Sequence, residues 1–121
     1  MKKLIIKRVH HVFGEPVPIT GGHTIQPIFV EPENSFYWKL NISLDEWIDD
    51  YIRSICNKKG ISSSCFWISR DHLISACHKY CEGRYTDLYH LVVERLINRY
   101  GYIDNGLYLK PSKSTMVVYP K

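Results

Sequence analysis

Two neighbouring segments decide the fold: residues 69–81 read SRDHLISACHKYC, and residues 86–99 read TDLYHLVVERLINR. In both segments apolar residues return every three or four positions, which is the period of a helix with one buried face. The spacing predicts helices over 70–81 and 86–99. Their predicted buried stripes are Leu73, Cys77 and Tyr80 or Cys81 in the first helix, and Leu88, Leu91, Val92 and Leu96 in the second.

The ends of these two helices carry their own signals. Ser69 is a typical N-cap residue, and Asp71 in the following turn favours the helix dipole. Gly83 ends the first helix, and Thr86 is the expected N-cap of the second. These signals predict a short turn between the two helices.

A third amphipathic pattern lies upstream. Residues 43–46 read SLDE, a capping box with serine at the N-cap and glutamate three positions later. Trp47, Tyr51 and Ile55 follow at intervals of four and form one apolar stripe. The pattern predicts a helix over 44–58.

Short extended runs flank the helices at the C-terminal side. The apolar run 65–68 is either a strand or the start of the next helix. Asp, Asn and Gly at 104–106 are a strong turn signal. Residues 107–109 and 115–119 are the predicted arms of a β-hairpin, with residues 110–114 at its tip.

The N-terminal part is rich in residues that favour strands. Residues 3–13 and 24–30 are predicted to pair as a loose β-hairpin, and residues 36–40 form a third extended piece. Pro27 places the second strand at an edge, because proline cannot donate a hydrogen bond to a neighbouring strand.

The length of 121 residues suits one domain with a single core, and 45% of the residues are hydrophobic. Glycines and prolines crowd residues 14–22, which read as a linker, and the piece before them is too short to fold alone. We therefore expect residues 1–42 to be an extension rather than an independent domain. The main domain is expected over 43–121.

The charge balance suits an anionic partner, since the formal net charge is +4 and the pI is about 8.9. The apolar run near the N-terminus stops after three residues, whereas a signal peptide needs about 7–15. No segment reaches the ~18 apolar residues of a membrane span. A cytoplasmic protein is expected, in the host cytoplasm if the chain is viral. The skew toward Lys, Ile, Tyr and Asn suits a virus or a mobile element.

The predicted order is helix, short apolar run, helix, turn, helix and hairpin. Residues 91–103 read LVVERLINRYGYI, in which a helix with alternating apolar and charged residues stops at Gly before an Ile-containing strand. Over about 43–119 the chain resembles a winged helix-turn-helix domain. The resemblance implies an α+β fold of three helices with a C-terminal β-hairpin wing, here with an N-terminal β-rich extension. It implies a small DNA-binding protein, such as a transcriptional regulator.

In that family the third helix lies in the major groove of double-stranded DNA, and the wing reaches the adjacent backbone or minor groove. The family's reading positions fall on Arg84, Tyr85, Thr86, Tyr89, His90 and Asn98. Wing contacts fall on Lys110, Ser112, Lys113 and Ser114. Asp87 and Glu94 depart from this pattern, because carboxylates near the reading face repel phosphate.

The same fold also serves as a non-enzymatic protein interaction module or as an inhibitor of a host factor, and this alternative stays open. Arg95 and Arg99 are more simply a solvated helix face than phosphate contacts. A homodimer is expected, because one small DNA-binding module buries little surface. Residues 1–42 are a candidate contact for a protein partner.

The four cysteines are Cys56, Cys65, Cys77 and Cys81. Cys77 and Cys81 share a helical face at a spacing that can hold zinc, but no CxxC pair supports a metal site and Cys77 falls on the apolar stripe. We predict no metal site. The chain contains no Walker loop, dinucleotide fingerprint or GxSxG motif, so neither enzyme activity nor a cofactor is predicted.

Overall fold

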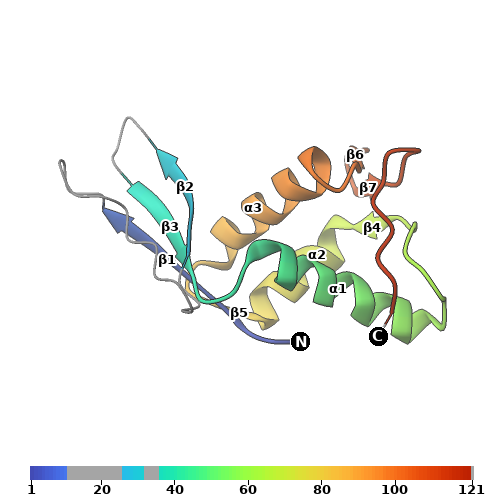
Figure 1. Cartoon of the computed structure of the whole chain (residues 1–121), viewed down its shortest axis with the longest axis horizontal. Coiled ribbons are helices and arrows are strands. Elements are labelled where there is room, and N and C mark those ends of the chain that lie inside the picture. Colours follow the sequence, from blue (N-terminus) through green and yellow to red (C-terminus); the bar gives the residue numbers. More distant parts are fainter. Residues whose placement is uncertain (11–25, 32–35, 121) are drawn as a thin grey trace.

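The computed structural model describes residues 1–10, 26–31 and 36–120 (Figure 1). Within these ranges the fold is mixed α+β, with three helices and two small sheets. In chain order the elements are β1 (Leu4–His10), β2 (Gln26–Glu31), β3 (Phe36–Leu40), α1 (Leu44–Lys59), β4 (Ile68–Ser69), α2 (Arg70–Lys79), β5 (Cys81–Glu82), α3 (Tyr85–Asn98), β6 (Ile103–Asp104) and β7 (Tyr108–Lys110).

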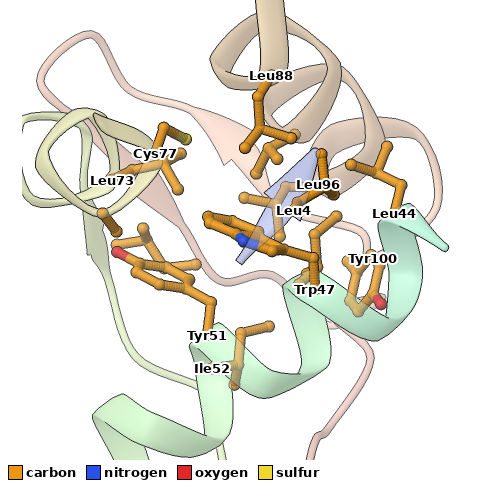
Figure 2. Close-up of a cluster of buried hydrophobic side chains, with 14 of the residues drawn as sticks. Leu4, Leu44, Trp47, Tyr51, Ile52, Leu73, Cys77, Leu88, Leu96 and Tyr100 are labelled. Atoms are coloured by element: carbon orange, nitrogen blue, oxygen red, sulfur yellow. The ribbon is translucent and has the colours of Figure 1, made fainter. Parts of the chain in front are cut away.

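Helix α1 supplies the centre of the core, and its bounds agree with the predicted 44–58 to one residue. Ser43 caps the helix as the capping box predicts, because its hydroxyl accepts a hydrogen bond from the Glu46 amide at 3.0 Å. Trp47 is fully buried and lies between α1, β1 and α3, with its ring stacked 5.7 Å from that of Tyr51 (Figure 2). The predicted stripe of α1 is therefore the surface on which the other elements pack.

Helices α2 and α3 are present, but their ends differ from the prediction. Helix α2 stops at Lys79, because the next residues leave the helix and pair with β1 as β5. The prediction that Thr86 caps α3 is wrong: the helix begins at Tyr85, and its N-cap, Arg84, makes no side-chain capping bond within the described residues. Gly83, in the turn before this N-cap, has a φ of +114°, a backbone conformation that glycine adopts readily.

The N-terminal sheet has the strand order β2-β3-β1-β5, so the predicted pairing of the first two strands is wrong. Strand β3 lies between β1 and β2 and pairs antiparallel with both. Leu4, Ile6, Trp38 and Leu40 are buried in the same cluster as the helices, which explains why β1 and β3 occupy the middle of the sheet. Pro27 lies in the edge strand next to a register shift, as its missing amide predicts. The remaining residues of the two predicted strands, and the predicted linker 14–22, fall outside the described ranges.

The second sheet has the order β4-β7-β6 and joins parts of the chain that lie on either side of α2 and α3. Its antiparallel hairpin, β6 and β7, turns at residues 105–107, so the predicted arms 107–109 and 115–119 with a tip at 110–114 are wrong. The Asp-Asn-Gly signal forms this turn. Gly106 has a φ of +78°, and its amide donates to the Asp104 carboxylate at 3.0 Å.

The segment after β7 bonds elsewhere, which is why it does not form the second arm of the hairpin. The Ser112 hydroxyl donates to the Gly101 carbonyl at 2.6 Å, and the Met116 amide donates to the Tyr100 carbonyl at 2.7 Å. Val118 and Ser64 exchange hydrogen bonds of 2.7 and 2.9 Å. This segment therefore covers the end of α3 and the loop before β4.

Among the described helices, none has both the length and the apolar character needed to cross a membrane.

Candidate nucleic-acid interface

Helix α3 packs one side on the core and leaves the other in solvent. Leu88, Val92 and Leu96 are fully buried, and they recur at intervals of four. The exposed positions on the opposite side are Thr86, His90, Glu94 and Asn98. The predicted outward positions Thr86, His90 and Asn98 are therefore exposed, whereas Tyr85 and Tyr89 are half-buried.

The first turn of α3 brings together three of the predicted DNA contacts. The Arg84 side chain is 75% exposed and lies 3.6 Å from the Asp87 carboxylate, which is largely covered. Thr86 is exposed one position beyond the half-buried Tyr85, whose ring packs edge-on against His78 of α2 at 4.8 Å. Arg84 and Thr86 are thus available to a partner, whereas Tyr85 holds α3 against α2.

Tyr89 belongs to a polar link that the sequence analysis missed. Arg70, at the start of α2, donates to the Tyr89 hydroxyl at 2.9 Å and forms an ion pair of 2.6 Å with Asp104 of β6. The hydrogen bond from Arg70 is the main reason that the pKa of Asp104 is lowered, and the same bond is the main reason that the pKa of Arg70 is raised. Arg70 therefore fixes the hairpin relative to the middle of α3.

The predicted wing residues do not form one tip. The Lys110 ammonium lies 5.7 Å from the centre of the Trp67 ring, and Ser112 is bonded to Gly101 within the chain. Lys113 and Ser114 are exposed, on the segment that packs against Gly101 beyond the C-terminal end of α3. The hairpin tip instead consists of Asn105, Gly106 and Leu107, and the structure places no lysine there.

The charges near α3 are partly used within the protein. Arg95 and Arg99 both face Asp45 of α1, at 3.9 and 3.3 Å, so they connect the two helices. Of the two carboxylates that depart from the family pattern, Asp87 is paired with Arg84 and Glu94 stays exposed beside His90 and Asn98. The outward face of α3 is therefore polar and mixed in charge.

The cysteines lie apart from this face. Cys56, Cys77 and Cys81 are buried, and burial raises the pKa of Cys77 to about 12 and that of Cys81 to about 11. Such thiols stay protonated at neutral pH and pack as small apolar groups. The described residues contain no cluster of three or more His, Cys, Asp or Glu that could hold a metal ion.

Comparisons with protein-family models, with curated proteins and with solved structures found no match to this chain.

Proposed function

We propose that the chain is a small DNA-binding protein of the winged helix-turn-helix type. The observation that carries the proposal is the connectivity: β4, between α1 and α2, pairs with the hairpin that follows α3. This arrangement places a short strand, a helix, a turn, an exposed helix and a hairpin in the order in which winged helices present their reading helix. The hairpin β6–β7 is then the wing.

The contacts follow from the exposed groups. Thr86, His90 and Asn98 carry the donors and acceptors that can meet base edges in the major groove, because they lie on the outward face of α3. Arg84 and Lys113 are exposed cations at the two ends of that helix and are suited to phosphate. Tyr85, Tyr89 and Ser112 take part in contacts within the chain and act as supports.

Binding of random duplex DNA at about 50 and 200 mM salt tests the proposal, since release of counterions makes such binding fall steeply with salt. Arg84→Ala together with Lys113→Ala should weaken binding to all sequences and lower the salt slope by about two. Lys58→Ala is the control, because Lys58 is also exposed but lies at the end of α1. Failure of the chain to bind duplex at the lower salt concentration would overturn the proposal.

A protein interaction module on the same fold is the second candidate function. The exposed apolar side chains on and beside the wing favour it. Leu107 is 75% exposed at the tip, and Ile103, Tyr108 and Trp67 are 52%, 42% and 47% exposed. The wing thus offers an apolar surface where a DNA-binding wing would need cations. This surface also suits contact with a second copy of the chain.

The variant Ile103→Asp with Leu107→Asp separates the two candidates. If the wing is a protein contact, the wild type should associate in sedimentation experiments and the variant should be a monomer with unchanged duplex affinity. If the wing contacts DNA, the variant should lose duplex affinity instead.

A further inference from the structure

A groove runs between α1 and α2, away from the outward face of α3. It consists of two adjoining hollows of about 300 and 160 Å³, which share Tyr51, Ile55 and His72. One hollow extends to Met1 and Tyr80, and the other ends at Trp67 and Ile68. As far as the structure describes the chain, no residue of α3 lines either hollow. We call it the α1–α2 groove.

The floor of the α1–α2 groove is firm and mainly apolar. Tyr51 is buried, stacks on Trp47 and is hydrogen-bonded through its hydroxyl to Nδ1 of His72 at 2.7 Å. Burial is the main reason that the pKa of Tyr51 is raised, so the hydroxyl keeps its proton at neutral pH. Ile55 and Ala76 complete this floor. A ligand therefore meets a surface whose shape is already set, which lowers the entropy cost of binding.

The rim of the groove is cationic. Lys58 and Lys79 line the larger hollow and Lys59 lines the smaller one. Among the described residues, neither lining includes an aspartate or a glutamate. The Lys59 ammonium lies 5.2 Å from the centre of the Phe66 ring, and that of Lys79 lies 5.4 Å from the centre of the Tyr80 ring. The rim therefore combines positive charge with aromatic surface.

Two features of the groove favour an acidic peptide over a nucleic acid as its anionic partner. An apolar floor gives a place for aliphatic or aromatic side chains, which a phosphate backbone does not have. The exposed ring that could stack on a base is Trp67, but Tyr108 packs edge-on against it at 5.8 Å and Lys110 lies over it. The groove thus suits a peptide better than a single-stranded nucleic acid.

We propose that the α1–α2 groove binds a short acidic segment of a partner protein, with apolar side chains of that segment on the floor and its carboxylates facing Lys58, Lys59 and Lys79. No described residue of α3 lines the groove, so a peptide in its larger hollow leaves the outward face of α3 open to a duplex. Such a site would let a DNA-bound copy recruit an acidic partner.

Selection of random displayed dodecapeptides against the full chain tests this proposal. Enriched sequences should be rich in Asp and Glu interleaved with Leu, Phe or Trp. Synthetic copies should shift the amide signals of α1 and α2 in NMR spectra. Lys58→Glu with Lys79→Glu should weaken their binding by about tenfold or more, because two attractive charges become repulsive.

Lys113→Glu is the control, since it reverses the charge of another exposed lysine, which lies beyond α3 and lines neither hollow, and it should leave peptide binding unchanged. The double variant should keep the wild-type melting temperature and duplex affinity; if it does not fold, Lys58→Ala with Lys79→Ala replaces it. The proposal would be refuted by enrichment of neutral or basic peptides, or by an absence of enrichment. Peptide binding that is equally strong to the wild type and to the double variant would refute it as well. Displacement of the peptide by oligo-dT, or self-association that the double variant abolishes, would assign the groove to a nucleic acid or to a second copy instead.

Discussion

The two sheets differ in the length of their longest strand pairing, and Figure 1 shows them at opposite ends of the helical body. In the N-terminal sheet, β1 and β3 pair over five residue positions and form a long ladder of main-chain hydrogen bonds. In the sheet β4-β7-β6, each pair of strands has only two paired positions. The short sheet therefore depends on its buried side chains, Ile68 and Leu109, and on the ion pair of Arg70 with Asp104.

The comparison indicates that buried side chains, rather than the length of a strand, hold an element of this protein in place. Two paired positions supply few hydrogen bonds, and each bond makes a net contribution of only about 0.5–1.5 kcal/mol to the stability of the fold. A fully buried leucine contributes more. The wing can therefore be short and still be fixed relative to α3, provided that Leu109 and Arg70 hold it.

The largest expected effect comes from truncating one buried leucine in each sheet. Leu4→Ala in β1 and Leu109→Ala in β7 should each lower the free energy of unfolding by about 2–5 kcal/mol, because both side chains are fully buried. Chemical denaturation measures both values. Leu107→Ala, at the exposed tip, is the control and should change stability by less than about 0.5 kcal/mol. If Leu109→Ala behaved like that control, the short sheet would not depend on burial.

A smaller effect is expected from a glycine in a turn next to each sheet. Gly106→Ala in the hairpin turn should cost about 1–2 kcal/mol, because the added Cβ meets only open space and the cost is that of a positive φ alone. Gly83→Ala should cost about 3 kcal/mol, since its Cβ would also collide with the Ile6 carbonyl oxygen of β1. Thermal unfolding of the two variants measures both losses of stability. Equal costs would mean that β1 and the α2–α3 turn do not approach as closely as described.

The smallest effect concerns the ion pair of the wing. Asp104→Asn keeps an acceptor for the Gly106 amide but removes the charge that faces Arg70. The pKa of Asp104 is lowered in the folded protein, so its contribution is present above the unfolded pKa of about 3.9 and is lost as the pH falls through the lower folded value. The variant should melt slightly below the wild type at pH 7, and the difference should disappear in acid. A difference that persists at low pH would point to packing rather than charge.

The helices could be predicted from the sequence because their signals are local. Trp47, Tyr51 and Ile55 repeat with the helical period, and the capping box marks where α1 begins. Strand partners could not be predicted in this way, since pairing joins distant residues and strand propensity depends on context. Thr115 to Tyr119 have the composition of a strand, yet Met116 and Val118 bond to Tyr100 and Ser64 instead of to β7.

The residues of the candidate interface likewise divide into those that a local pattern predicts and those that depend on contacts between distant parts of the chain. The outward positions of α3, such as Thr86 and His90, follow from its period and are exposed as expected. The prediction of the wing residues is wrong because the Asp-Asn-Gly turn is the tip of the hairpin and not the approach to it. The role of Arg70 had no sequence signal, because it depends on where Tyr89 and Asp104 lie in space.

The parallel pairing of β1 with β5 has a consequence for synthesis on the ribosome. Leu4 is translated well before its neighbour in the sheet, Cys81, which follows only after α1 and α2 are complete. Until then β1 has only β3 as a strand partner, and Leu4, which is fully buried in the folded chain, is not yet covered by β5. A nascent chain in which β5 is still inside the exit tunnel should therefore remain sensitive to protease, whereas one in which the α2–α3 turn has emerged should begin to resist it.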